Sequence, residues 1–200
     1  MPDATPGLHD DLVARIAAGD REAFADLYGH CRADVYRFAL HMCGSPALAE
    51  DVVQDVFLAV IGAARRYRPG RSGVLPWLLG IASNHVRRWR HRRKLHPLPD
   101  AESREGTALS TMNDLVGDLT RERHQAELVR ALLALPVRYR EVIVLCDLQE
   151  LSYEAAAGGL GCAVGTVRSR LHRGRAQLAR SLEDLKEVRI PDQRPANRFT

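Results

Sequence analysis

Apolar residues recur at three- and four-residue spacing along most of the chain, which is the period of a helix buried on one face. The clearest stretches run from Phe24 to Met42 and from Leu48 to Ile61. No stretch of useful length alternates apolar and polar residues as a half-buried strand would. The pattern therefore predicts an all-α protein.

Helix-capping and helix-breaking residues divide this pattern. Asp20 and Ser45 are expected to cap helices at their N-termini, and Pro46 suits the first position of the second of these helices. The segment 68–73 is rich in Pro and Gly and is expected to be a loop, after which a helix is predicted over 76–93. The sequence thus predicts an N-terminal bundle of about four helices.

The C-terminal half carries breaks of the same kind. They fall at 135–136, at 149–152 and at 158–165, and they divide this half into about four further helices. We expect two small helical domains, at 8–94 and 122–185, joined by a flexible acidic linker at 95–121 and followed by a tail at 186–200. Since few contacts need to cross such a linker, the sequence does not predict how the two domains sit relative to each other.

The composition of the 200 residues, 46% apolar and 27% charged, is typical of a soluble globular protein. No apolar run approaches the roughly 20 residues that span a bilayer, so no membrane insertion is expected. The first residues carry acids rather than the basic and apolar run of a signal peptide. We therefore expect a cytoplasmic protein.

The charges are unevenly distributed, and this points to nucleic acid more than the net charge of +4 does. Six basic residues and no acid lie between Arg87 and Lys94, whereas 97–120 holds five acids and one base. Basic residues return over 168–180. The chain therefore has two cationic blocks separated by an acidic connector.

The second cationic block lies on a helix-turn-helix pattern. A short helix capped by Ser152 leads through a turn at 161–163 to an Arg-rich helix over 164–178. In that geometry the second helix enters the major groove, where Arg can form two hydrogen bonds with guanine. A solvated basic helix without DNA contacts remains the simpler alternative. Gly158 and Gly159 each cost about 1 kcal/mol in a helix, so the first helix is expected to end early.

The N-terminal half carries two further candidate surfaces. Acidic and amide side chains at Glu50, Asp51, Gln54 and Asp55 form a polar face opposite an apolar stripe, which suits either plain solvent exposure or docking onto a basic protein surface. The helix after the loop interleaves aromatic and amide groups with arginines, a combination that suits single-stranded DNA. Within it Trp77 is expected in the core, and Trp89 is the better candidate for stacking on a base.

No catalytic or metal site is expected. The four cysteines form no C-x-x-C pair. Cys31, His41 and Cys43 leave open a metal or redox site, but small buried side chains explain them more simply. Asp51 and Asp55 share a helix face without a third ligand or an activating base. We therefore expect no metal, no cofactor and no enzymatic activity.

Two long segments resemble a known family. Residues 49–94 read AEDVVQDVFLAVIGAARRYRPGRSGVLPWLLGIASNHVRRWRHRRK and resemble the second conserved region of extracytoplasmic-function (group 4, sigma-70 family) sigma factors. Residues 134–178 read ALPVRYREVIVLCDLQELSYEAAAGGLGCAVGTVRSRLHRGRAQL and resemble the fourth region. The resemblance implies a sigma factor that binds core RNA polymerase and directs promoter recognition, DNA melting and transcription initiation.

The resemblance also implies a role for individual positions. Contact with the clamp helices of the largest polymerase subunit is implied for Asp51, Gln54, Asp55 and Phe57. Binding of the −10 element is implied for Arg68, Arg71, Asn84, Arg87, Arg88 and Trp89. Binding of the −35 element is implied for Arg138, Tyr139, Ser152, Arg168, Ser169, His172 and Arg173.

The implied partners are core RNA polymerase, through its clamp helices and its flap, promoter DNA, and an anti-sigma factor that holds the protein inactive. The acidic linker resembles the family's segment that passes through the polymerase active-site cleft. An alternative is a helix-turn-helix regulator that binds duplex DNA without polymerase. That alternative explains the C-terminal half but gives the segment 51–57 no role.

Overall fold

The computed structural model describes residues 8–69, 73–95 and 119–187, and all regular structure within these ranges is helical. The N-terminal half contains four α-helices, which are α1 (Leu8–Ala17), α2 (Arg21–Cys43), α3 (Pro46–Ala63) and α4 (Val74–Leu95), with a short 3₁₀ turn, η1 (Ala64–Arg66). The C-terminal half contains α5 (Leu119–Ala134), α6 (Val137–Ile143), α7 (Tyr153–Leu160) and α8 (Val164–Glu187), with a π-helical turn, η3 (Val144–Leu148), after α6. The prediction of an all-α chain with two sets of about four helices is confirmed. Most of the predicted linker and tail lies outside the described residues.

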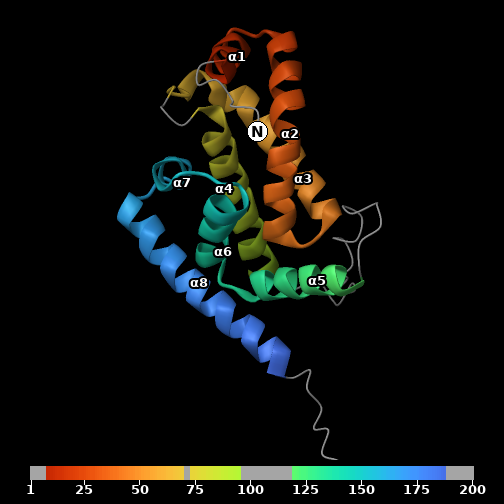
Figure 1. Cartoon of the computed structure of the whole chain (residues 1–200). Helices are drawn as coiled ribbons and strands as arrows, with labels where there is room; N and C mark the ends of the chain where they lie inside the picture. The colour runs from red at the N-terminus through yellow and green to blue at the C-terminus, as the bar shows by residue number, and fades with distance from the viewer. Residues whose placement is uncertain (1–7, 70–72, 96–118, 188–200) are drawn as a thin grey trace, which may run out of the picture.

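The N-terminal bundle is shaped by the caps that the sequence predicted. The Asp20 carboxylate accepts hydrogen bonds from the backbone N–H groups of Glu22 and Ala23, at 2.9 and 3.1 Å, at the start of α2. Ser45 caps α3, and the two-residue turn before Pro46 makes α2 and α3 antiparallel neighbours (Figure 1). Apolar faces of these helices pack on α4, which lies at the centre of the molecule (Figure 1).

The helix-turn-helix is formed by α7 and α8. The Ser152 hydroxyl accepts a hydrogen bond from the backbone N–H of Ala155 at 3.1 Å and so caps α7. Gly161 closes α7 with a φ of 64°, a left-handed conformation that glycine adopts without steric cost. Val167 and Leu171 then turn one face of α8 into the core, which fixes the opposite face toward solvent.

The expectation that α7 ends early is wrong, because the helix continues through both glycines to Leu160. Gly159 lies directly against α4, where a Cβ atom on it would stand 2.3 Å from the carbonyl oxygen of Pro76. A Cβ atom on Gly80 would likewise stand 2.0 Å from the carbonyl oxygen of Gly159. Gly80 and Gly159 therefore let α4 and α7 touch backbone to backbone. This packing compensates for the poor helix propensity of these two residues.

The two halves share one continuous core. Buried apolar residues extend from Leu12 in α1 to Leu171 in α8, and α4 has α2 and α3 on one side and α7 on the other (Figure 1). Arg140 of α6 is fully buried, and it donates a hydrogen bond across the junction to the carbonyl oxygen of Met42 at 2.6 Å. The placement of the halves, which the sequence left undetermined, is thus a close packing. No helix in the described ranges is long and apolar enough to cross a membrane.

We expect Asp20→Ala to lower the free energy of unfolding by about 1 kcal/mol, because α2 loses its N-cap, and Asp20→Asn to lower it much less. The Asn variant keeps a capping oxygen but loses the ion pair that Asp20 makes with Arg15 at 2.6 Å. Urea unfolding followed by circular dichroism measures both values. Equal losses in the two variants would assign the effect to the ion pair rather than to the cap.

Candidate nucleic-acid and protein interfaces

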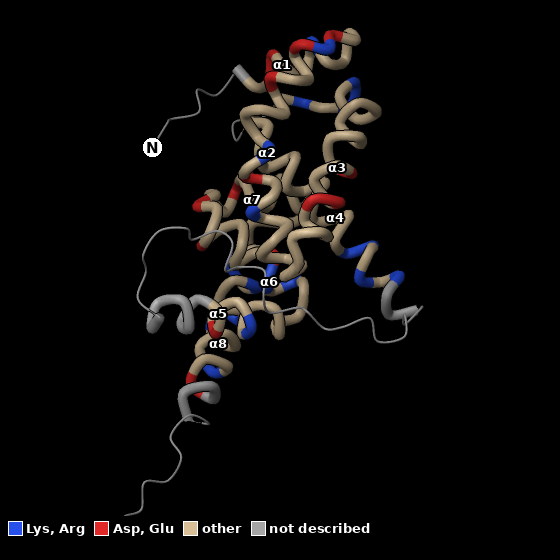
Figure 2. Tube along the Cα trace, turned by 90° about the vertical axis from the view of Figure 1, so that its right-hand side faces the viewer, with Lys and Arg blue, Asp and Glu red and all other residues tan. Residues whose placement is uncertain are grey.

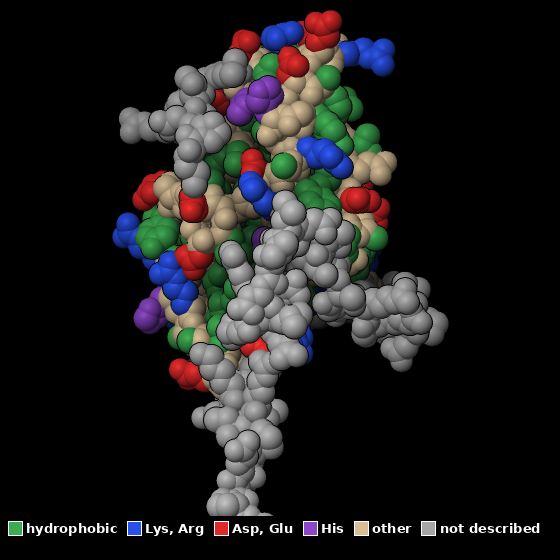
Figure 3. Space-filling view, turned by 45° about the vertical axis from the view of Figure 1, so that its right-hand side comes forward, with side chains coloured by type: hydrophobic (Ala, Val, Ile, Leu, Met, Phe, Trp, Pro, Cys, Tyr) green, Lys and Arg blue, Asp and Glu red, His purple; other side chains and the backbone are tan. Residues whose placement is uncertain are grey.

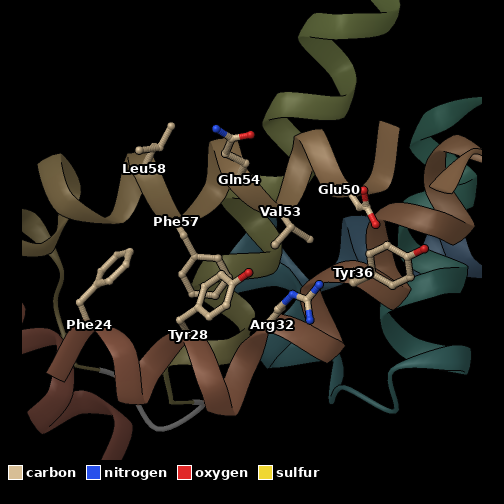
Figure 4. Close-up of a pocket in the computed structure, with 9 residues that line it drawn as sticks. All are labelled: Phe24, Tyr28, Arg32, Tyr36, Glu50, Val53, Gln54, Phe57 and Leu58. Carbon is tan, nitrogen blue, oxygen red and sulfur yellow. The ribbon is translucent and has the colours of Figure 1, made fainter. Parts of the chain in front are cut away.

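A groove of about 470 Å³ runs between α2 and α3. Figure 4 shows side chains of the two helices pointing toward each other across it. Its lining residues are Phe24, Tyr28, Arg32, Tyr36, Glu50, Val53, Gln54, Phe57 and Leu58. Apolar walls with charged groups at one end suit a protein side chain or helix better than a nucleic acid.

Phe57 forms the floor of this groove. Its side chain is only 2% exposed, and its ring meets Tyr28 and Phe24 edge to face at centroid distances of 4.8 and 6.2 Å. Phe57 therefore shapes the groove from below, while the partly exposed Tyr28 and the exposed Leu58 and Ile61 offer apolar contact area. In the space-filling view, hydrophobic side chains reach the surface among charged ones in the upper half of the molecule (Figure 3).

The predicted polar face of α3 is exposed at Asp51, Gln54 and Asp55. All three border a second cavity, of about 340 Å³, that α4 closes with His85, Trp89 and Arg92. A carboxylate oxygen of Asp55 lies 3.2 Å from Nδ1 of His85. Residues of two predicted surfaces thus line one cavity. Asp51, Gln54 and Asp55 were predicted to contact polymerase, and Trp89 was predicted to bind DNA. Trp89 is half-buried in its wall.

The positions predicted to bind −10 DNA divide into three groups. Arg68, Asn84 and Arg88 are exposed, and Arg71 lies outside the described residues. Arg87 is half-buried and bonds to Glu141 of α6, with Nε 2.8 Å from Oε2 and the terminal nitrogen 2.5 Å from Oε1. Lys and Arg positions gather along the C-terminal half of α4 (Figure 2). Trp77 is part-buried with its ring centroid 4.7 Å from that of Tyr67, in the core as expected.

The predicted −35 residues of α8 share one exposed face. Arg168, Ser169, His172 and Arg173 are all exposed and follow one another at helical spacing. Arg138 of α6 lies over the Tyr139 ring, 4.8 Å from its centroid, and donates a 3.4 Å hydrogen bond to its hydroxyl. That hydrogen bond, with a smaller contribution from Arg173, lowers the pKa of Tyr139. Arg138, Tyr139 and Arg173 therefore form one cationic surface.

The exposed Ser152 lies in the same half, and its hydroxyl is occupied as the cap of α7. Between the halves, a cleft of about 430 Å³ is lined by Arg87, Arg90, His91, Pro136, Val137 and Arg138. The sequence did not predict this cleft, because its arginines come from helices more than 40 residues apart.

Sequence reasoning missed Glu141, Ser83 and Arg170. Glu141 is fully buried, and its carboxylate accepts hydrogen bonds from the Ser83 hydroxyl at 2.9 Å and from Arg170 at 3.4 Å, in addition to Arg87. The available signal was an acid within the apolar run of α6 and η3, since a buried carboxylate requires partners.

The cysteines are free thiols in the described structure. Cys31 and Cys43 are 2% and 6% exposed, and burial raises their pKa values to about 12 and about 11. Within the described ranges, no group of three or more His, Cys, Asp or Glu side chains is arranged to hold a metal ion.

Comparisons with known proteins match both halves. Residues 27–95 match the family model of Sigma-70 region 2, and residues 125–178 match that of Sigma-70, region 4. The ECF RNA polymerase sigma factor SigE of Mycolicibacterium smegmatis is 38% identical over 148 residues, which are 72% of this chain and 55% of that protein. The chain thus spans about half the length of that relative. The RNA polymerase sigma factor CarQ of Myxococcus xanthus is 34% identical over 174 residues, which are 86% of this chain and 97% of that protein.

Two solved structures share the fold. CnrH in complex with the cytosolic domain of CnrY has a TM-score of 0.64 at 28% identity, over 88% of this chain and 97% of that chain. The sigma factor RpoE in complex with the anti-sigma factor NepR, from Bartonella quintana, has a TM-score of 0.61 at 25% identity, over 80% and 96%.

We expect Cys31 and Cys43 to resist alkylation by iodoacetamide at pH 8 in the folded protein, because the thiolate is the reacting form and burial disfavours it. The half-exposed Cys162 should react first. Mass spectrometry of timed samples, with a urea-unfolded control, gives the order. Early modification of Cys31 or Cys43 would show that these thiols are accessible and would revive the redox interpretation.

Proposed function

The chain belongs to the extracytoplasmic-function family of sigma-70 factors. From this premise we propose which surface of the chain binds each of its partners during transcription initiation. The groove between α2 and α3, with the polar face of α3, binds core RNA polymerase. α4 and the loop before it capture the opened −10 strand, and α8 reads the −35 duplex. The observation that carries the proposal is the presence, in one chain, of an exposed arginine face on a helix-turn-helix and an apolar docking groove remote from it.

Polymerase binding combines an apolar anchor with a charged rim. The partly exposed ring of Tyr28 and the exposed side chain of Leu58 provide the apolar area, over the floor made by Phe57. The carboxylates of Asp51 and Asp55 provide negative charge for a basic partner such as the clamp helices, and they contribute mainly to orientation and association rate. The polymerase flap is the second contact, on the C-terminal half.

Promoter DNA is bound through two kinds of contact. On α4, Asn84 and Arg88 are exposed to solvent, and they bind the opened strand, with the amide group bonding to base edges and Arg to phosphates. On α8, the exposed Arg168 and Arg173 bind guanine in the major groove, and the exposed Arg138 of α6 binds the DNA backbone. Melting then needs no catalysis, because binding energy directed at the open strand favours the separated form. The protein acts by binding alone and is not an enzyme.

The proposed partners include an inhibitor. The similar solved proteins CnrH and RpoE are described in complexes with CnrY and NepR, and we extend the same kind of partner, an anti-sigma protein, to this chain. Action on polymerase and promoter DNA would take place in the cytoplasm, and we include this localisation in the proposal. A regulator that acts without polymerase is the less favoured function, because it leaves the groove and the match over 27–95 without a role.

Transcription by sigma-free bacterial core polymerase on a library of genomic fragments tests this function. Discrete start sites that depend on the added protein are expected, and the sequences shared upstream of them identify both promoter elements. Duplex binding by the protein without retention on core polymerase or initiation would favour the polymerase-independent regulator.

We expect Arg173→Ala to weaken binding of duplex −35 DNA by about 1–3 kcal/mol, the range for one side chain that reads a base, with core polymerase binding unchanged. Arg180→Ala is the matched control, since it removes an exposed arginine from the same helix. Fluorescence anisotropy with promoter fragments and with core polymerase measures both affinities. Loss of polymerase binding in Arg173→Ala would refute the assignment to DNA.

We expect Asp55→Arg to give the reverse result, with polymerase affinity lowered about tenfold or more, because like charges across an interface cost several kcal/mol. Duplex −35 binding should be unchanged. Asp26→Arg, at an exposed acid of α2, provides the same change of charge away from the proposed face. Equal losses of polymerase affinity in both variants would point to net charge rather than to this surface.

A further inference from the structure

The cavity between α3 and α4, which we call the α3–α4 cavity, has the size and lining of a small-ligand site. Its volume of about 340 Å³ lies near the lower end of the roughly 300–1,000 Å³ that such sites occupy, which is room for one nucleotide-sized molecule. The buried part of its lining is apolar, because Val52 is 7% exposed, Cys43 is 6% exposed and Leu48 packs against the core. A flat ring can therefore lie in it away from water.

Two carboxylates and an amide form one edge of the α3–α4 cavity. Asp51 and Asp55 lie one helical turn apart on α3, with Gln54 between them in sequence. The Asp55 carboxylate is 3.2 Å from Nδ1 of His85, whereas the side chains of Asp51 and Gln54 make no hydrogen bond or ion pair within the described part of the chain. A carboxylate accepts two hydrogen bonds side by side, and guanine offers two neighbouring donors, its ring N–H and its amino group. Asp51 is therefore suited to hold the edge of a guanine base.

α4 supplies an aromatic ring and a cation to the same cavity. Trp89 is half-buried in the wall, and an indole face can stack on any base. Arg92 is exposed three residues further along α4, and its side chain has no hydrogen bond or ion pair in the described ranges. A guanidinium in this position can bind a phosphate through charge-assisted hydrogen bonds. The α3–α4 cavity thus combines groups for the base and for the phosphate of one nucleotide.

The same groups disfavour other occupants. A basic side chain of a protein partner would meet Arg92 as well as the carboxylates, and like charges oppose it. An apolar side chain would leave Asp51 and Gln54 without hydrogen bonds. A base of the promoter strand is disfavoured because the strand is open only with polymerase bound, and polymerase in the proposed function covers Asp51, Gln54 and Asp55. A free nucleotide is the occupant that uses every group.

We propose that the α3–α4 cavity binds a free guanine nucleotide, and that the bound nucleotide and core polymerase exclude each other. The base stacks on Trp89 with its edge at Asp51, and the phosphate lies at Arg92. Exclusion follows because Asp51, Gln54 and Asp55 belong both to the cavity and to the polar face of α3 that we propose to bind polymerase. The exclusion rests on the proposed function, whereas nucleotide binding by the free chain does not.

Calorimetric titration of the free chain with guanosine monophosphate (GMP) and adenosine monophosphate (AMP) tests the site. We expect GMP to bind at least about tenfold more tightly, because adenine presents only one donor beside an acceptor and leaves a hydrogen bond of Asp51 unmade. Asp51→Asn should remove this preference, and Asp26→Asn, at an exposed acid of α2, should keep it. Equal affinity of the wild-type chain for the two nucleotides, or binding of neither, would overturn the proposal.

Two further variants locate the nucleotide. Arg92→Gln should weaken GMP binding about tenfold, the effect of losing one hydrogen bond to a charged group, and should leave guanosine binding unchanged because guanosine has no phosphate. Arg180→Gln removes an exposed arginine of α8 as the matched control. Trp89→Leu should weaken GMP and guanosine alike by about tenfold, the effect of one lost stacking contact, with its fold checked by circular dichroism.

Equal losses of GMP and guanosine affinity in Arg92→Gln would contradict the placement of the phosphate. Binding of a guanine-rich single-stranded oligonucleotide without binding of GMP would overturn the free nucleotide as the occupant and assign the cavity to DNA.

Competition is then measured with core polymerase. At a GMP concentration about ten times its own dissociation constant, the apparent polymerase affinity of the wild-type chain should fall about tenfold, and that of Arg92→Gln only about twofold. The comparison between the two chains corrects for any GMP that polymerase itself binds. GMP binding with unchanged polymerase affinity would overturn the exclusion. Absence of polymerase binding in every chain would count against the proposed function alone, since calorimetry reports nucleotide binding without polymerase.

Discussion

Glu141 is a fully buried carboxylate whose partners come from both halves of the chain. Because a buried charge without partners is strongly destabilising, its presence in α6 ties the position of that helix to α4. Arg140 beside it is also buried and bonds to the carbonyl oxygen of Met42. Arg140 and Glu141, two adjacent charged residues of α6, thus fix the C-terminal half on the N-terminal half. The contact of Gly80 in α4 with Gly159 in α7 follows from that placement.

The arrangement leaves some of the proposed binding surfaces exposed and engages a residue of another. The groove between α2 and α3 is lined by those two helices alone and is open in this arrangement. The arginine face of α8 that we propose to bind DNA is also exposed, while Arg87 of α4 is bonded to Glu141. The groove proposed for polymerase is therefore accessible in this arrangement, whereas Arg87, predicted to bind DNA, already has a protein partner.

The helices, their caps and the helix-turn-helix were predictable from the sequence, because spacing, Asp20, Ser45 and the turn near Gly161 are local signals. The early end expected for α7 was wrong, since Gly159 serves a contact with α4 that is 79 residues distant in the chain. The buried Glu141 network was missed for the same reason, as its partners are 29 to 58 residues away. Phe57 was predicted to contact polymerase directly, but it is buried beneath Tyr28, and this burial depends on how α2 packs on α3.

The most direct test of this account is the distance between spin labels at Asp26 and Gln177, which are exposed positions on the two halves. It is measured by pulsed electron resonance in the free chain and in its complex with core polymerase and promoter DNA. The account predicts a short, narrow distribution in the free chain and a lengthening on the order of tens of ångströms in the complex, as the separation of the two elements on DNA requires. The same distance in both samples would contradict it.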